Sequence, residues 1–294
     1  MKWITYVQEN EQKLGALLPC GDKIVPLSAL GIKREFCNMI DFIEEVTEEE
    51  KAAAKALWVD TNPAAIDAGS VQILSPITRP IHDIMCVGVN YLEHQNEFKR
   101  AAEVLDPNRA AIYFGKRASK ILGSGDELEY CPEIDIKLDY EVELAVIIGK
   151  EGKNIPAEKA EEYIFGYSVF NDFSARALQR KHIQWFKGKS LDGYSAMGPA
   201  IVDKSLISYL PELNVQSIVN GELRQNSNTR LMMTTISKII EDLSSGMTLE
   251  PGDIIATGTP SGVGAGFDPP KCLKKGDTVE CVIEQVGSLV TKIV

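Results

Sequence analysis

Short apolar segments, each bounded by glycine, proline or asparagine, recur along most of this sequence and limit the folds open to it. The clearest examples are Ile84–Val89, Glu143–Ile148, Tyr167–Phe170 and Gly198–Val202. Segments this short are typical of buried strands. Helical patterns are fewer, and we expect them around residues 91–104, 156–164, 174–186 and 235–243. The sequence therefore predicts an α+β fold dominated by a mixed sheet or β-roll.

The N-terminal part of the chain also contains short strand-like segments, and one predicted helix follows them. Strand-like runs occupy Trp3–Val7, Leu14–Leu18 and Ile24–Pro26. Thr47 and Glu50 then form a capping box ahead of the helix-favouring Ala52–Leu57. The prolines and glycines that follow are typical of a link. We predict a small N-terminal α+β domain, residues 1–75, and a larger domain, residues 76–294.

The composition limits the binding partners and the cellular compartment that we expect for this protein. The formal net charge of −11 disfavours nucleic acid as a partner. The start of the chain does not resemble a signal peptide, and no apolar stretch approaches the roughly 20 residues that span a bilayer. We therefore expect a cytoplasmic protein with no membrane partner. The six cysteines form no C-x-x-C pair, so we expect reduced, packed thiols.

Three acidic residues form the first candidate site. If the segment around Glu141 and Glu143 is a strand, both side chains leave the same face, because strands alternate with period two. On a solvated face they are only the polar half of an edge strand, whereas in a cleft they need a cation to offset their repulsion. Asp172 follows an apolar run and is either a helix N-cap or a third ligand. An all-carboxylate triad favours Mg²⁺, Mn²⁺ or Ca²⁺ over zinc.

A histidine and a glutamate form a second candidate pair. His94 and Glu97 lie three residues apart in a segment that is compatible with a short helix, so they share one face. His94 is a candidate general base, with Glu97 orienting its ring or sharing its proton. The alternative is a weak pair on a solvated helix.

Two further segments carry groups that handle anions. We expect Phe186–Ser190 to be a glycine-containing loop in which Lys187 or Lys189 either stabilises an oxyanion or merely aids solubility. The Gly/Thr/Ser-rich segment Gly252–Gly264 follows strand-like residues, and its backbone N–H groups are candidates to bind a carboxylate. It contains neither a Walker motif nor a dinucleotide-binding glycine motif.

Five motifs in this order resemble the fumarylacetoacetate hydrolase (FAH) family. They are Val87–Tyr91 with His94 and Glu97, Asp139–Glu143, Asn171–Asp172, Gly188–Ser190 and Thr257–Gly264. The resemblance covers roughly residues 80–294. It implies an FAH-like mixed β-sandwich roll as the catalytic domain, residues 76–294, and a homodimer.

The resemblance also implies roles for individual residues. The three acids match the family's metal ligands for Mg²⁺ or Mn²⁺, with Ca²⁺ as an occupant that crystals can capture. His94 and Glu97 match the water-activating dyad on a lid, and Lys189 matches the active-site lysine. Substrate-binding positions are matched by Arg176, Gln179 and Thr259. After the lysine, Ser190–Met197 departs from a common family pattern that often contains Phe, Cys and Pro, which leaves the substrate open.

The function implied by this resemblance is a metal-dependent hydrolase that cleaves a C–C bond in acylpyruvate-type 2,4-dioxo acids through a metal-bound enolate. The same site serves two alternatives within the family, 2-hydroxyhepta-2,4-diene-1,7-dioate isomerase and oxaloacetate decarboxylase. A catalytically idle protein that senses a small 2-oxo or dioxo carboxylic acid is a further alternative from another class.

Overall fold

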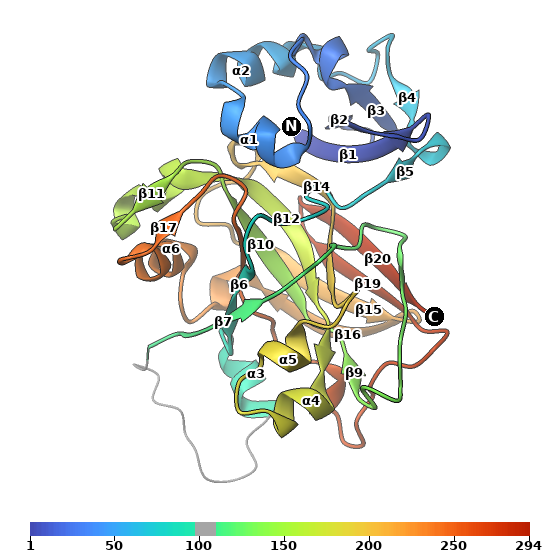
Figure 1. The fold of residues 1–294 in the computed structure, drawn as a ribbon, viewed down its shortest axis with the longest axis vertical. Helices are drawn as coiled ribbons and strands as arrows, with labels where there is room; N and C mark the ends of the chain where they lie inside the picture. The colour runs from blue at the N-terminus through green and yellow to red at the C-terminus, as the bar shows by residue number, and fades with distance from the viewer. Residues whose placement is uncertain (98–109) are drawn as a thin grey trace.

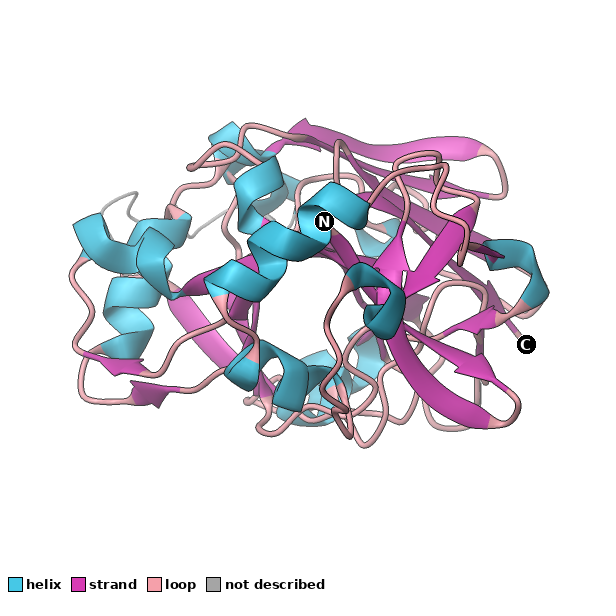
Figure 2. Ribbon diagram, turned by 90° about the horizontal axis from the view of Figure 1, so that it is seen from above, coloured by secondary structure: helices cyan, strands magenta, loops and turns pink. Residues whose placement is uncertain are grey.

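The computed structural model describes residues 1–97 and 110–294. One large sheet runs through it in the strand order β4-β3-β2-β1-β14-β12-β10-β18-β6-β7, and β5 pairs with β1. A second sheet has the order β16-β15-β19-β20-β8. Seen from above, short helices lie among long strands, and the C-terminus lies at one edge of the molecule (Figure 2). The expected α+β class is confirmed.

The N-terminal segment supplies one end of the large sheet and two helices (Figure 1). Its strands are β1 (Lys2–Gln8), β2 (Glu11–Leu17), β3 (Lys23–Pro26), β4 (Ile66–Asp67) and β5 (Gln72–Ile73). Its helices are α1 (Met39–Glu45) and α2 (Glu48–Leu57). The capping box of Thr47 and Glu50 is present at the start of α2. Helix α1, which begins at the Asn38 N-cap, was not among the predicted elements.

This N-terminal segment is joined to the rest of the chain by hydrogen bonds and by a common core. Strand β1 pairs with β14, which places Trp3 opposite Ile201. Phe42 of α1 packs edge-on against Trp3 and also against Phe165, at ring centroid distances of 4.8 and 6.2 Å. The domain boundary at residue 75 stays a prediction.

The remaining strands of the large sheet are β6 (Ile84–Gly88), β7 (Ile112–Lys116), β10 (Val142–Ile148), β12 (Ile164–Asp172), β14 (Ser195–Asp203) and β18 (Ile254–Ala256). Strand β7 is at the edge of the sheet and is mostly half-buried. Every residue of β10 and β12 is buried, which explains why these strands read as continuous apolar runs rather than as alternating ones. A charged side chain on either strand is therefore enclosed by protein.

The second sheet packs beside these central strands. It contains β8 (Glu127–Leu128), β15 (Asn214–Val219), β16 (Glu222–Asn228), β19 (Thr278–Ile283) and β20 (Gly287–Ile293). Asn220 and Gly221 join β15 to β16 with φ angles of 51° and 83°. Positive φ at both central positions is the signature of a type I′ turn, which an Asn-Gly pair favours. Two short ladders complete the sheets, β9 (Leu138–Asp139) with β13 (Ser174–Ala175) and β11 (Gly152–Lys153) with β17 (Thr248–Leu249).

The helices of the larger part differ in detail from the sequence prediction. They are α3 (Leu92–Glu97), α4 (Arg176–Lys181), α5 (Phe186–Lys189) and α6 (Ile236–Ser244). The last confirms the helix predicted around 235–243. The one predicted around 174–186 is two short helices, because the chain turns away between them, and residues 157–163 form a 3₁₀ helix. Residues 98–104 of the first predicted helix lie outside the described residues.

The remaining 3₁₀ turns are η1 (Leu27–Leu30), η2 (Ala68–Ser70), η4 (Lys204–Leu206), η5 (Thr229–Leu231) and η6 (Gly264–Gly266). All six cysteines are free thiols, as expected, but Cys20 and Cys37 are exposed rather than packed. Within residues 1–97 and 110–294, none of the helices has the length and apolar character that a bilayer crossing requires.

Candidate active site

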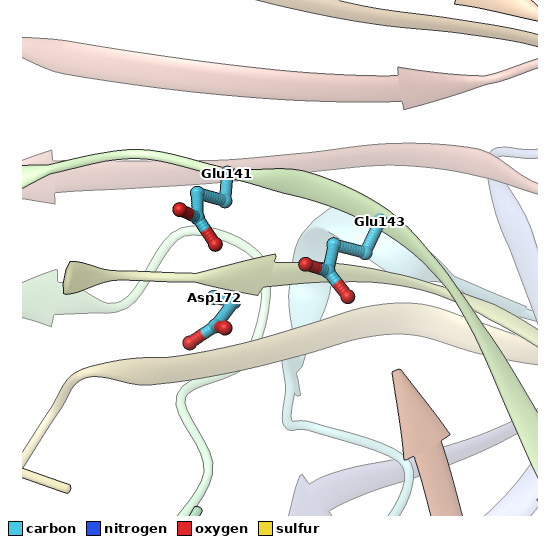
Figure 3. Close-up of side chains that lie close together, drawn as sticks. All are labelled: Glu141, Glu143 and Asp172. Carbon is cyan, nitrogen blue, oxygen red and sulfur yellow. The ribbon is translucent and has the colours of Figure 1, made fainter. Parts of the chain in front are cut away.

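Strand pairing brings the three predicted acids together. Glu141 directly precedes β10 and Glu143 lies within it, so both project to the same side. The Asp172 N–H donates to the Glu141 carbonyl at 2.9 Å, which places Asp172 beside Glu141 at the end of β12. One ligand oxygen from each acid lies within 4.8 Å of the others, and Figure 3 shows the three carboxylates turned toward one another. The alternative of a solvated edge strand is wrong, because all three are buried.

The alternative of an N-cap role for Asp172 is also wrong. Helix α4 begins later, at Arg176, and no side chain caps its N-terminus. The Asp172 carboxylate instead contacts two lysines, Lys116 Nζ and Lys189 Nζ, each at 2.6 Å. Its side chain therefore belongs to the buried charge cluster and not to a helix end.

Lys189 links two of the acids. Its Nζ lies 2.6 Å from Glu141 Oε2 and 2.6 Å from Asp172 Oδ2. Burial lowers the pKa of Lys189, but Asp172 and Glu141 outweigh that effect and raise it above its usual value. Lys189 lies in the short helix α5 and not in a loop, and it is buried, whereas Lys187 is exposed. The structure thus separates the two lysines that the sequence left equivalent.

Arg176, at the start of α4, holds a neighbouring pair of acids. Its Nε donates to Asp139 Oδ2 at 2.8 Å, and its second terminal nitrogen lies 2.6 Å from Glu141 Oε1. The other terminal nitrogen donates to Gln179 Oε1 at 3.1 Å. In this arrangement Arg176 positions a candidate metal ligand. Its expected substrate-binding role stays a prediction.

The charge balance differs between the acids. Burial raises the pKa of Glu141, but Lys189 and Arg176 outweigh it and hold that pKa far below its usual value. Glu143 has the opposite environment, because burial, Asp172 and Glu141 together raise its pKa well above its usual value. The Gly258 N–H donates to it at 2.8 Å, and no lysine or arginine of residues 1–97 and 110–294 pairs with it. The negative charge of Glu143 therefore needs a cation other than these side chains to offset it.

The second predicted pair is also formed. His94 Nδ1 lies 2.8 Å from Glu97 Oε2 on α3, and His94 is buried. The other oxygen of Glu97 accepts the Gly262 N–H at 2.6 Å. This second bond ties α3 to the glycine-rich loop after β18 and fixes the orientation of the pair. The alternative of a loose pair on a solvated helix is therefore wrong.

That glycine-rich loop does bind carboxylates, but those it binds are the protein's own. The N–H groups of Gly258 and Gly262 hold Glu143 and Glu97, and those of Gly264 and Ala265 hold Asp139. Thr259 in the same loop donates its hydroxyl to the Val142 carbonyl and accepts from Gln225. The loop thus sets the positions of acids on both sides of the site.

These groups line one cavity of about 310 Å³. Its lining consists of Val87, Gly88, Val89, His94, Phe114, Glu141, Glu143, Arg176, Gln179, Arg180, Trp185, Lys189 and Thr259. All the predicted site residues are on that lining except Glu97, which holds His94, and Asp172, which contacts Lys189. Val89 has a φ of 55°, a strained conformation for a β-branched residue and one that is common beside functional sites.

Two charged members of the cluster, Lys116 and Asp139, were not assigned a role from the sequence. Lys116 is fully buried at the end of β7, and it also donates to the Phe173 carbonyl at 2.9 Å. Asp139 is fully buried and accepts two loop N–H groups besides Arg176. The sequence does show that Lys116 ends an apolar strand and that Asp139 lies two residues before Glu141. These positions do not reveal the partners of Lys116 and Asp139, because the partners lie far away in the sequence.

We expect Asp139→Asn to weaken both the fold and the site. The change leaves Arg176 buried beside a neutral group and points an amide at loop donors, and breaking a buried ion pair costs about 3–5 kcal/mol. Because Arg176 also orients Glu141, we expect turnover to fall about 10- to 100-fold. Urea denaturation and steady-state kinetics measure the two effects. Unchanged values for both would show that Asp139 does not organise the site.

The family of the chain follows from comparison with known proteins. A model of the C-terminal part of fumarylacetoacetate (FAA) hydrolase matches residues 83–294. This protein belongs to the FAH family. The solved structure of the fumarylacetoacetate hydrolase from psychrophilic Exiguobacterium antarcticum superposes with a TM-score of 0.85 at 36% identity, covering 100% of this chain and 99% of that one. The predicted FAH-like fold is thereby confirmed.

Relatives within the FAH family differ in their named activities. Oxaloacetate tautomerase YisK of Bacillus subtilis (strain 168) is 46% identical over 223 residues, 76% of this chain and 73% of that protein. The mitochondrial oxaloacetate tautomerase fahd2 of Xenopus laevis is 38% identical over 284 residues, 96% and 86% of the two chains. The maleylpyruvate hydrolase of Sphingobium sp. SYK-6, solved with manganese(II) and pyruvate, has a TM-score of 0.79 at 29% identity and covers 100% of this chain and 99% of that one.

The acidic triad fits a divalent metal ion. It offers only carboxylate oxygens, the ligands that Mg²⁺ and Mn²⁺ prefer. Four buried carboxylates face three buried cations in the cluster, so one negative charge is in excess, and Glu143 carries it unpaired. Glu141, Glu143 and Asp172 are therefore the residues that would hold the ion. The protein is an FAH-family enzyme with a candidate acidic metal site.

Proposed function

We propose that this enzyme is a metal-dependent keto–enol tautomerase of a small 2-oxo acid, with oxaloacetate as the first substrate to test. The observation that supports it is the presence of His94, Glu141 and Glu143 on the lining of one cavity, with Asp172 beside the two glutamates. That arrangement suits proton transfer at the carbon next to a carbonyl group. The two relatives named as oxaloacetate tautomerases support the choice of substrate.

Enolisation of oxaloacetate breaks a C3–H bond, forms the C2=C3 double bond and leaves a proton on the C2 oxygen. Glu141, Glu143 and Asp172 would hold a divalent metal ion, which would supply a Lewis acid for the 2-oxo group. Lys189 adds a buried positive charge beside the same carboxylates. Both features favour the charge that develops on the C2 oxygen.

We assign His94 as the base that removes the proton from C3. Its Nδ1 is held by Glu97 at 2.8 Å. In the tautomer that donates this hydrogen bond, Nε2 is the basic nitrogen and takes the proton from C3. Glu97 stabilises the imidazolium that results, and the imidazolium then gives this proton to the C2 oxygen to complete the enol. The reverse transfers return the proton to C3 during ketonisation. Val87, Phe114 and Trp185 form an apolar wall that limits competing proton exchange with water.

C–C hydrolysis of acylpyruvate-type acids is the second candidate. In that reaction His94 activates a water molecule, and atoms of water enter the products. The similarity to a maleylpyruvate hydrolase supports this possibility. The isomerase and decarboxylase alternatives use the same polarised carbonyl, and neither adds water to the products.

The deciding experiment follows the ultraviolet absorbance of enol-oxaloacetate as it converts to the keto form, with Mg²⁺, Mn²⁺ or chelator. The control is Glu143→Gln protein with the same metal, because free metal ions also catalyse this reaction. We expect a rate well above that control, with no loss of CO₂. A parallel arm incubates acylpyruvates in ¹⁸O-labelled water. Solvent oxygen in a cleavage product, with no acceleration of the tautomerisation, would favour the hydrolase instead.

A further inference from the structure

We infer that Arg180 forms a subsite for a second carboxylate of the substrate, so that the enzyme selects 2-oxo dicarboxylic acids over 2-oxo monocarboxylic acids. This inference rests on the proposed function and adds a substrate class to it. The feature that carries it is the pairing state of the cations on the cavity lining, which are Arg176, Arg180 and Lys189.

Two of these cations are already committed to carboxylates of the protein. Lys189 contacts Glu141 and Asp172, and Arg176 contacts Asp139 and Glu141. Both are buried, and moving either toward a ligand would leave a buried acid without its partner, which is costly. A substrate carboxylate that needs a cationic partner at the cavity therefore has to find it elsewhere.

Arg180 meets that need. It lines the same cavity near the end of α4 but is exposed, and no hydrogen bond or ion pair in the described parts of the chain holds its guanidinium. It lies four residues after Arg176, so both lie on one face of the helix, about 6 Å apart along its axis. The inner end of a bound dicarboxylate then lies near the acidic triad, and the outer carboxylate lies near Arg180.

Gln179 adds a neutral donor beside Arg180. Its side-chain oxygen accepts a hydrogen bond from Arg176 at 3.1 Å, which turns its NH₂ group away from that arginine. The amide and the planar guanidinium together offer several N–H donors at the outer part of the cavity. Arginine binds a carboxylate through two parallel hydrogen bonds, which a single point charge cannot reproduce.

The test uses non-reacting ligands, so that it does not depend on turnover. Titration calorimetry with Mn²⁺-loaded protein compares (S)-malate with (S)-lactate, two 2-hydroxy acids that differ by the second carboxylate. We expect the wild type to bind malate about tenfold more tightly or better, as for a charge-assisted hydrogen bond. Arg180→Gln should reduce that ratio to about twofold or less.

The matched control is Lys181→Gln. Lys181 is the next residue, is also exposed and cationic, but is not part of the cavity lining. We expect this variant to keep the wild-type ratio, because removing a general surface charge affects both ligands through screened, long-range attraction only. Equal loss in both variants would contradict a specific subsite.

Failure of this inference can be told apart from failure of the proposed function. A wild type that binds malate and lactate equally, or an Arg180→Gln variant that keeps the full preference, overturns the subsite even if oxaloacetate is tautomerised. A malate preference that depends on Arg180 supports the subsite even if the enol assay shows no catalysis, in which case only the reaction type has to be revised.

Discussion

Glu143→Gln should abolish metal-dependent turnover and, at the same time, make the metal-free protein more stable. The variant keeps the shape of the side chain and can still accept the Gly258 N–H, but it removes a buried carboxylate that has no cationic partner among the described residues. Removing the charge of such a group should raise the free energy of unfolding by about 1–3 kcal/mol. Loss of a metal ligand should lower turnover by about 100-fold or more, which exceeds the usual effect of removing a residue that only hydrogen-bonds to a ligand.

Glu141→Gln is the matched control for this prediction. Glu141 pairs with Lys189 and Arg176, so its neutralisation leaves buried cations uncompensated and should cost about 3–5 kcal/mol. Both variants are expected to be inactive, yet they should move the free energy of unfolding in opposite directions. Urea denaturation in the presence of chelator measures it. Destabilisation of equal size in both would contradict the charge assignment.

The stability difference also depends on pH. The pKa of Glu143 is raised above its usual value of 4.5, so the folded metal-free protein binds this proton more tightly than the unfolded chain does. Its stability therefore falls as pH rises from about 4.5 through the raised pKa, and the glutamine variant lacks this loss. We expect the two proteins to differ least near pH 4.5 and most at neutral or higher pH.

The second large effect is expected from His94→Ala. If His94 transfers the proton at C3, its removal should lower kcat about 10²- to 10⁴-fold, the usual range for a general acid–base group. The affinity for Mn²⁺ should stay unchanged, because His94 is not among the three acids of the candidate metal site. Steady-state kinetics and calorimetric titration with Mn²⁺ separate the two quantities.

Added imidazole should restore part of the activity of His94→Ala, since the cavity vacated by the ring can admit the free base. Glu97→Gln is the companion variant, because it retains the ring but weakens its orientation, and we expect an intermediate loss of about tenfold. Full activity of His94→Ala would remove the proposed base from the mechanism and leave the metal site unaffected.

The sequence predicted those parts of the site that depend on local order. Glu141 and Glu143 share a side because of strand periodicity, and His94 and Glu97 meet because of helical spacing. The capping box at Thr47 is likewise local. In each case the interacting residues lie within a few positions of each other.

The parts that could not be predicted depend on contacts between distant segments. Lys116 reaches Asp172 from another strand, and the carboxylate of Asp139 is held by the loop at Gly264. Asp172 resembled an N-cap because the sequence does not reveal that its strand continues to residue 172, or that α4 starts only at Arg176. Strand pairing, which the sequence does not specify, decides these positions.

The most direct test of the metal site is a titration of the metal-free protein with Mn²⁺, followed by electron paramagnetic resonance of the free ion. We predict that one equivalent per chain is taken up and that Mg²⁺ competes for it. The Glu143→Gln variant should leave the free-ion signal undiminished. A wild type that takes up no Mn²⁺, or that keeps full activity after removal of all divalent metal, would contradict a cation among these three carboxylates.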